Sequence, residues 1–288
     1  MISGIAVFCV YLDNHNSISG YEGKYVFKDF NKKINHIESI SLKSSQSELN
    51  FVKKDGIWKI DGNEKLPLYQ ERVRSFLVNL SNMIFYEKKS DKVEDMKYFG
   101  FSPLENKNSP MIEVTLRDEN GKNIERFDIG WHDIDLGRDS KASFIKFENQ
   151  FQVWMVDVDF YDLSLEKELW TYSSLWNLRF GRFISYNDIN EEKDIMNIVK
   201  NLINTTIIDV KDDVDGKLEG KITINAENSN DVELLFYSTK DNKYFVKYKF
   251  LADINGKHLK FFADSIKDKF VEISEDDWKK LKNDIISK

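Results

Sequence analysis

Residues 51–62 read FVKKDGIWKIDG, and this stretch indicates which class of fold the chain adopts. Asp55-Gly56 is a dipeptide that favours the tight two-residue turn of a β-hairpin. Because side chains alternate between the two faces of a strand, Trp58 and Ile60 after the turn share one face. The stretch therefore predicts a hairpin in which the turn sets the register and the tryptophan packs across onto the preceding strand.

The segment after this hairpin predicts a helix. Pro67 is placed to occupy the first helical turn, where its missing N–H would have had no helical partner. Apolar residues then recur at intervals of three and four, which is the spacing of one buried helical stripe. The stripe consists of Val73, Phe76, Leu77, Leu80, Met83 and Ile84.

Two further hairpins follow in the sequence. Residues 112–129 alternate apolar and polar positions around Glu119-Asn120-Gly121-Lys122, and Asn-Gly is a strong turn signal. Residues 142–157 are predicted to form the second of these hairpins. Residues 165–176, LEKELWTYSSLW, then predict the start of a short amphipathic helix that carries Trp170.

A similar order of elements recurs in the second part of the chain. A second apolar helical stripe precedes a strand pair around Asn228-Ser229-Asn230, and residues 244–250 and 258–265 are predicted to continue the meander. A last strand leads through Ser274, placed as a helix N-cap, to a helix with Trp278. The second stripe consists of Ile195, Ile198, Val199, Leu202 and Ile203.

These patterns together predict an α+β fold of antiparallel β-meanders, each packed with helices, in two similar tandem halves. Residues 1–29 are assigned to an apolar anchor remnant and linker, 30–178 to a first α+β unit, and 179–288 to a second, shorter unit. The junction between the halves is expected within residues 176–192.

Composition limits the classes of function that suit this chain. Its 288 residues carry a net charge of -7, with both signs interspersed along the sequence. Nucleic-acid binding depends on a clustered basic surface, so we expect no nucleic-acid partner. The one cysteine, Cys9, allows no internal disulfide.

An apolar run, Ile2–Leu12, stands near the start of the chain and is interrupted by Ser3 and Gly4. A membrane-spanning helix needs about 20 apolar residues, so this run is too short to span a bilayer by itself. Two interpretations stay open. The run is either a buried or frayed terminal strand, or the outer part of an anchor helix that begins upstream of Met1.

Several ordered motifs resemble the domain-of-unknown-function 4340 family. They are KDGIWKI at 54–60, YFGFSPLE at 98–105, a hairpin ending at Gly130, VWMVD at 153–157 and LWTYSSLWNL at 169–178. The resemblance covers roughly residues 30–180. It implies a membrane-anchored protein of the cell envelope whose body lies outside the cytoplasm, in the periplasm. Some members accompany ABC-type transport systems, including gliding-motility auxiliary proteins. The family has no established catalytic residues, so none is carried over to this chain.

Acidic residues gather in two segments, and each offers a possible chemistry. The segment WHDIDLGRD at 131–139 could ligate a divalent metal through His132 and its aspartates, but no second His or Cys lies nearby, which favours a polar loop. The segment VDVDFYD at 156–162 holds paired carboxylates, of which one could act as a general acid and the other as a general base. Its position after a strand favours turn and cap roles. The aspartates are Asp133, Asp135, Asp139, Asp157, Asp159 and Asp162.

Residues 211–222, KDDVDGKLEGKI, match a calcium-binding loop only in part. Aligning Gly216 with position six of such a loop puts Lys211 and Ile222 where calcium ligands are required. A charged turn is therefore predicted. The sequence assigns no catalytic, cofactor-binding or metal-ligating residue and predicts no cofactor.

Candidate residues for contact with a partner are Trp131, Arg179 and Arg182. The segment RFGRF at 179–183 could meet an acidic partner or lipid headgroups, and a tryptophan could line a binding surface. The plainer interpretation is that the rings are buried and the arginines solvated.

Three functions are compatible with these features. The preferred hypothesis is a non-catalytic, membrane-tethered, extracytoplasmic interaction module, accessory to an ABC-type transport system or envelope assembly and with transporter or envelope proteins as partners. The second is a module that binds a small ligand or glycan. The third is a hydrolase that uses the aspartate clusters. The preferred hypothesis predicts that the chain, with its upstream codons restored, partitions with membranes.

Overall fold

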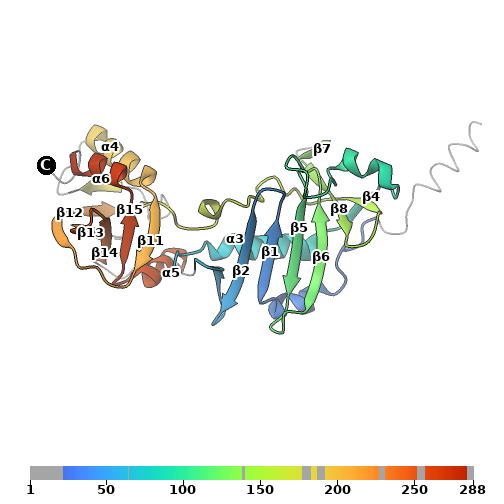
Figure 1. The fold of residues 1–288 in the computed structure, drawn as a ribbon, viewed down its shortest axis with the longest axis horizontal. Coiled ribbons are helices and arrows are strands. Elements are labelled where there is room, and N and C mark those ends of the chain that lie inside the picture. Colours follow the sequence, from blue (N-terminus) through green and yellow to red (C-terminus); the bar gives the residue numbers. More distant parts are fainter. Residues whose placement is uncertain are drawn as a thin grey trace, which may run out of the picture. The chain divides into compact units, whose positions relative to one another are not determined.

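The structure is a computed structural model that describes residues 22–63, 65–137, 140–176, 183–186, 192–226, 231–251 and 257–283. The chain forms two compact units (Figure 1). The first unit comprises Met1–Asp61 and Gln70–Lys167, and the second comprises Gly62–Tyr69 and Glu168–Lys288. The predicted division into 30–178 and 179–288 did not include residues 62–69 in the second unit.

The first unit is built on an antiparallel sheet that has nine strands among the described residues. These are β1 (Ser39–Lys43), β2 (Glu48–Lys54), β3 (Ile57–Ile60), β4 (Phe85–Lys88), β5 (Ile112–Arg117), β6 (Asn123–Ile129), β7 (Ile134–Gly137), β8 (Ser140–Phe147) and β9 (Val153–Val156). The order in the sheet is β3-β2-β1-β5-β6-β8-β9-β4, and β7 pairs with β8. The three predicted hairpins are β2–β3, β5–β6 and β8–β9.

The β2–β3 hairpin confirms the prediction made from residues 51–62. Lys54 pairs with Ile57 across a two-residue turn, and Asp55 and Gly56 have φ values of 52° and 76°. Two positive φ values in succession are characteristic of a type I′ turn, whose twist matches that of the flanking strands. Trp58 is buried and lies opposite Lys53 on β2, whose Nζ is 5.9 Å from the tryptophan ring centroid.

Helix α3 (Gln70–Asn82) lies across one face of this sheet (Figure 1). Its predicted apolar stripe is buried at Val73, Phe76, Leu77 and Leu80. The predicted start at Pro67 is wrong, because Leu68 instead forms a β-bridge with Thr171. The backbone from Pro67 to Tyr69 is held by hydrogen bonds to residues 170 and 172, so the chain cannot turn into a helix there.

The segment before β1 covers the same sheet face as α3. It contains the short helices α2 (Phe30–Lys33) and η1 (Ile34–His36). Phe27 packs against Phe127 of β6, with ring centroids 5.1 Å apart. Burial of such apolar rings against the sheet is the main stabilising contribution on this face.

A smaller cluster covers part of the opposite sheet face. The 3₁₀ helix η2 (Val93–Phe99) and the loop after it contribute Met96, Phe101 and Met111, which pack with Val153 of β9. Elsewhere this face carries polar side chains, which suits an antiparallel sheet with one wet face.

The second unit is built on a sheet with six strands among the described residues. These are β10 (Phe183–Tyr186), β11 (Ile207–Lys211), β12 (Lys217–Ala226), β13 (Val232–Ser238), β14 (Tyr244–Phe250) and β15 (Phe270–Ile273). The order is β10-β12-β13-β14-β15-β11. The helices are α4 (Glu192–Asn204), α5 (Lys257–Ile266) and α6 (Glu275–Leu281).

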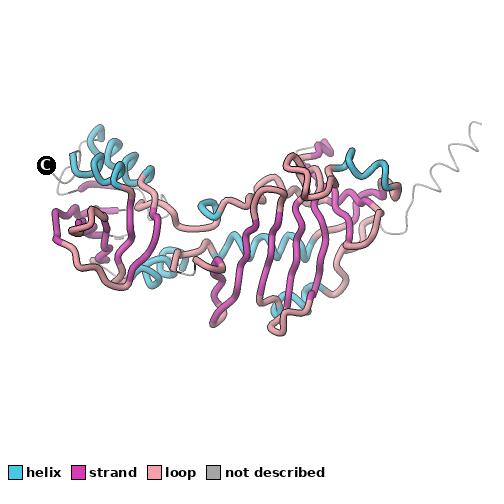
Figure 2. Tube along the Cα trace, in the orientation of Figure 1, coloured by secondary structure: helices cyan, strands magenta, loops and turns pink. Residues whose placement is uncertain are grey.

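All three helices of the second unit contribute to one hydrophobic core. Leu202 of α4, Phe262 of α5 and Trp278 of α6 belong to the same buried cluster as the inward side chains of the strands. Ser274 caps α6 as predicted, since its Oγ accepts a hydrogen bond from the Asp277 N–H at 3.0 Å. Figure 2 shows the helices of this unit in cyan and its strands in magenta.

The two sheets share one topology. With the β2–β3 hairpin and β7 set aside, the first unit contains the order β1, α3, β4, β5, β6, β8, β9, and the second contains β10, α4, β11, β12, β13, β14, β15. The first strand of each series (β1 or β10) pairs with the strand that starts the meander (β5 or β12), and the strand after the helix (β4 or β11) pairs with the last strand (β9 or β15). The predicted α+β fold in two similar halves is confirmed. Among the described residues, helix α5 has no counterpart in the first unit, and the β2–β3 hairpin and β7 have none in the second.

Two predicted elements are wrong. Residues 258–265 were expected to be a strand but lie in α5, because Phe262, Ala263 and Ile266 are buried at a helical spacing. Residues 165–176 contain only a short 3₁₀ helix, η3 (Lys167–Leu169). Beyond it the chain is extended and bridges to Leu68 and Thr206. Most of the predicted junction at 176–192 lies outside the described residues.

Candidate functional site

The structure places one of the three predicted contact residues. Trp131 follows β6 and is 46% exposed. Its N–H donates to the Phe99 carbonyl at 2.9 Å, and its own carbonyl accepts from the Phe144 N–H at 2.8 Å. The indole is therefore presented on the surface by a backbone that is tied on both sides. Arg179 and Arg182 lie outside the described residues.

The carboxylates of the two acidic segments serve the local fold. An oxygen of Asp157 accepts a hydrogen bond from the Ile84 N–H at 2.8 Å. One oxygen of Asp159 accepts from the backbone N–H groups of Asp133 and Tyr161, each at 3.0 Å. Asp133 forms an ion pair with Lys141. These contacts correspond to the turn and cap roles of aspartate. Asp139 lies outside the described residues.

Of the segment 211–222 that was predicted as a charged turn, residues 212–216 connect β11 to β12, whereas residues 217–222 are the first part of β12. Asp212 pairs with Lys65 at 2.9 Å, and the side chain of Asp213 accepts a hydrogen bond from the Val214 N–H at 2.9 Å. Among the residues placed by the structure, no group of three or more His, Cys, Asp or Glu side chains gathers as a metal site would require.

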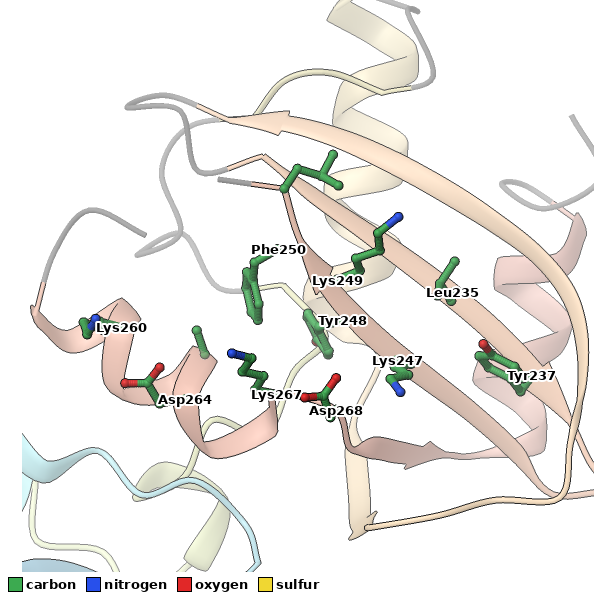
Figure 3. A pocket seen from close by; sticks show the side chains of 12 residues that line it. Leu235, Tyr237, Lys247, Tyr248, Lys249, Phe250, Lys260, Asp264, Lys267 and Asp268 are labelled. Carbon is green, nitrogen blue, oxygen red and sulfur yellow. The ribbon is translucent and has the colours of Figure 1, made fainter. Parts of the chain in front are cut away.

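The second unit contains a groove among its described residues. It has a volume of about 940 Å³ and lies between β13 and β14 on one side and α5 on the other (Figure 3). Its walls combine aromatic rings with charged side chains. They include Tyr237, Lys247, Tyr248, Lys249 and Phe250 from the strands, Lys260 and Asp264 from α5, and Lys267 and Asp268 from the turn after it.

One wall of the groove is an edge of strand β14 that no described strand covers beyond Lys247. On its other edge, β14 pairs with β13 along its whole length, but β15 pairs with β14 only as far as Lys247. The Leu251 N–H donates to Asp231 and the Lys243 carbonyl accepts from Thr239, so odd-numbered residues direct their backbone groups to β13. By the alternation of antiparallel ladders, Tyr248 and Phe250 direct theirs into the groove. No strand among the described residues pairs there.

Tyr248 forms a fixed floor for this edge. Its hydroxyl donates to the Leu175 carbonyl at 2.6 Å, and its ring lies 6.1 Å from that of Phe250 in a stacked arrangement. Burial raises the pKa of the Tyr248 hydroxyl well above its usual range, because a buried phenolate would lose its hydration. The hydroxyl therefore remains a proton donor at every physiological pH.

Lysines give the groove a positive character. Lys260, Lys267 and Lys249 are exposed, and the Lys247 Nζ lies 5.0 Å from the ring centroid of Phe270. Lys249 is paired with the buried Glu233 at 2.9 Å. The lining contains four lysines and two aspartates, so the groove favours anionic groups.

Sequence reasoning missed this groove, although part of its signal was present. In YFVKYKF at 244–250, basic Lys247 and Lys249 alternate with aromatic Tyr248 and Phe250. That alternation places the cations and the rings on opposite faces of one strand. The incorrect assignment of 258–265 to a strand hid the opposite wall, because a continued meander would have filled the edge.

Comparison with known proteins gives one match. The model of the family described as "Domain of unknown function (DUF4340)" matches residues 58–214. The match extends from β3 through the turn after β11, so the groove-lining residues 235–268 lie outside it. Neither the curated proteins nor the solved structures include a match to this chain.

Proposed function

The chain belongs to the family described as a domain of unknown function (DUF4340), and from this premise we propose that it is a non-catalytic interaction module. In this proposal its amino-terminal apolar segment tethers it to a membrane, its body lies outside the cytoplasm, and it serves a transport system or an envelope assembly. The family description names no activity, so the proposal rests on the features of this chain.

The groove of the second unit is the observation that carries the proposal. It combines an open strand edge, aromatic rings and exposed lysines over a volume of about 940 Å³, which is within the size range of binding sites. A rigid core lies beneath it, since Tyr248 and Phe262 belong to the main hydrophobic cluster. Such a surface is suited to binding a partner molecule without chemical conversion of it.

The surroundings of the aspartates support a non-catalytic role. A general acid or base needs a carboxylate free to reach a substrate proton. The backbone hydrogen bonds accepted by Asp157 and Asp159 instead join β4, β9 and the segment around Asp133. We therefore assign Asp157 and Asp159 a structural role in the first unit.

The membrane tether rests on the apolar run Ile2–Leu12 and on what the family resemblance implies. No helix in the described part of the chain has both the length and the apolar character to cross a membrane. The test is fractionation of cells that express the chain from its natural coding region. A variant with Val7→Asp and Val10→Asp is expected to leave the membrane fraction that the natural chain occupies, and recovery of both chains in the soluble fraction would remove the tether.

Interaction through the groove is tested by photocrosslinking in cells. A photoreactive amino acid at Lys260, on the α5 wall, is expected to give a discrete adduct with a partner protein. The same residue at Lys122, exposed in the β5–β6 turn of the first unit, serves as the control. Adducts of equal intensity at both positions, or none at Lys260, would contradict the proposal.

A further inference from the structure

We propose that the groove between β14 and α5 binds an extended acidic peptide segment of a partner protein, which adds as a strand to the open edge of β14. This inference rests on the proposed function, because it names the kind of partner that the interaction module takes. It follows from the backbone geometry of the edge, the side chains around it and the difference between the two units.

The open edge supplies the backbone groups that an added strand needs. Strand β14 continues to Phe250, while its pairing with β15 stops at Lys247. The backbone groups of Tyr248 and Phe250 face the groove, as the pattern of hydrogen bonds to β13 requires. Peptides that add to a sheet edge obtain affinity from such main-chain bonds. Because β15 is antiparallel to β14 on this same side, we infer antiparallel addition.

The alternation of side chains on β14 indicates which peptide fits. Lys247 and Lys249 lie on one face of the strand, and Tyr248 and Phe250 lie on the other. An added strand places its side chains beside those of β14 on the same face. A peptide with acidic residues on the lysine face and apolar residues on the aromatic face would therefore complement both.

The wall formed by α5 strengthens the preference for an acidic segment. Lys260 of α5 and Lys267, just after α5, are exposed and line the groove together with Asp264 (Figure 3). Within the described part of the chain, no carboxylate lies within ion-pair distance of either lysine. Helix α5 packs on the aromatic face of β14, since Phe262 contacts Tyr248. These two cations therefore border the apolar side of the added strand and favour an acidic segment through the positive potential of the groove.

The comparison of the two units shows that the groove is a particular feature of the second. In the first unit, a short hairpin loop joins β8 to β9, and the pairing continues as far as Lys146 and Val153 near the end of β8. In the second unit, α5 is inserted at the corresponding place, and β15 starts too late to cover the last residues of β14. An exposed strand edge promotes aggregation unless it is protected or used.

Peptide binding to the purified full chain tests the proposal. The probe is an acetylated and amidated peptide of about nine residues in which Glu and Val alternate. We expect saturable binding in calorimetric titration, and at least tenfold weaker binding of a block peptide of equal composition. Its charge is the same, but it cannot place acidic and apolar residues on separate faces. Equal affinity for both peptides would overturn the proposal.

Two readouts test strand addition itself. N-methylation of the valine amides, which face β14 in antiparallel addition, is expected to abolish binding, whereas methylation of the glutamate amides is expected to preserve it. In residue-resolved hydrogen exchange, the peptide should slow the amides of Tyr248 and Phe250 at least tenfold and leave those of Lys247 and Lys249 unchanged. An equal effect of both methylations, or unchanged exchange at Tyr248 and Phe250, would contradict strand addition.

The role of charge is tested with exposed lysines, which limits the risk of misfolding. Lys260→Glu combined with Lys267→Glu is expected to weaken peptide binding about tenfold. The control combines Lys43→Glu with Lys122→Glu, which are exposed in the first unit and change the net charge equally. Its affinity should stay within about twofold of that of the natural chain. Equal weakening by both variants would assign the effect to net charge and overturn the site.

The remaining alternatives are distinguished from the proposal by further probes. Binding of anionic phospholipid vesicles with no binding of the alternating peptide would assign the groove to a lipid surface. Self-association in sedimentation, lost on addition of Lys260→Glu, would assign the edge to a second copy. Either result overturns the acidic-peptide inference. A persistent crosslink at Lys260 in cells would still uphold the interaction module, so the failure of one proposal can be told from failure of the other.

Discussion

Two glycines in the first unit mark a close approach between distant segments. Gly100 follows η2 with a φ of 88°, and Gly130 directly follows β6. The Trp131 N–H donates to the Phe99 carbonyl across the contact. A Cβ on Gly130 would lie 2.1 Å from the Phe99 oxygen, and one on Gly100 would lie 2.6 Å from the Trp131 nitrogen. Both glycines belong to motifs of the family resemblance. The close contact between them explains why each of these motifs has a glycine at that position.

Gly130→Ala is therefore expected to destabilise the chain by about 3 kcal/mol, because backbone atoms cannot move aside as a flexible side chain can. Urea unfolding measures the effect. Gly121→Ala is the matched control, since Gly121 has a φ of 75° but open space around its Cβ position. It should cost only about 1 kcal/mol, the strain of the left-handed backbone. Equal costs for the two variants would refute the close contact.

Glu233 links the groove to the acid stability of the second unit. Hydrogen bonds from Lys221 and then Lys249 hold the pKa of its carboxyl below the usual value, with Nζ to oxygen distances of 2.8 and 2.9 Å. A depressed folded pKa stabilises the fold above the unfolded pKa, and this contribution is lost as the pH falls through the folded pKa. The two lysine side chains are about 60% exposed, at 61% and 60%, so solvent screens the interaction.

The expected contribution of ionised Glu233 is about 1 kcal/mol at neutral pH. The difference in unfolding free energy between the natural chain and Glu233→Gln should shrink as the pH falls below about 4.3, the ordinary glutamate pKa. Urea unfolding across that pH range measures it. Glu119→Gln, at an exposed turn position, should show no such trend. If this difference in unfolding free energy grew toward acid pH, ionised Glu233 would not stabilise the fold.

At the scale of elements, one side chain joins helix α3 to the edge of the first sheet. Gln70 is the first residue of α3. Its carboxamide oxygen accepts from the Trp58 N–H at 2.9 Å, and its Nε2 donates to the Trp58 carbonyl at 2.7 Å. The Gln70 carboxamide thus bonds the backbone groups of Trp58 as a neighbouring strand would do at this edge of β3. The bonds position the helix on the hairpin that carries the buried tryptophan.

Gln70→Ala is expected to destabilise the chain by about 2 kcal/mol, because it removes two hydrogen bonds and leaves part-buried backbone groups without partners. Gln70→Glu retains the acceptor for the Trp58 N–H but loses the donor, so its cost should be about half as large. Chemical denaturation ranks the variants, and hydrogen exchange at the Trp58 amide should accelerate only in Gln70→Ala. Faster exchange in Gln70→Glu as well would contradict this assignment of the carboxamide.

Local signals were sufficient for some elements but not for others. Asp55 and Gly56 encode their own turn geometry, so the β2–β3 hairpin was predictable from adjacent residues. Residues 258–265 carry consecutive aromatic residues that suit a buried strand as well as a helix. The helix follows from packing of Phe262 against Tyr172 and Tyr248, at 4.8 and 5.7 Å between ring centroids. That packing depends on residues far away in the sequence.

At the scale of the whole molecule, the second unit depends on a short segment that precedes α3. Leu66 belongs to the core of that unit, Leu68 bridges to Thr171, and Lys65 pairs with Asp212. The core is therefore completed by residues that lie more than a hundred positions before most of it. A single cut between the units would leave the second unit without this segment.

A fragment containing residues 168–288 is expected to be unstable alone and to gain stability when a synthetic peptide of residues 62–69 is added. The gain should follow mass action and rise with peptide concentration, as a thermal unfolding series would measure. A peptide with Leu66→Ser and Leu68→Ser is the control and should have little effect, because both side chains are buried. Equal stability with and without the natural peptide would show that the segment is dispensable.

The sequence by itself determined the alternation of strands and helices, the hairpin turns and the duplicated order of elements, because these depend on residues close together in the chain. Only the tertiary structure decided that Leu68 leaves the helix to bridge Thr171, and that Gly100 meets Gly130. It also decided that β14 extends past β15 beside α5 to open a groove. Each of these features arises from contact between segments distant in sequence, and the free energy of such contacts is set by packing that no local pattern encodes.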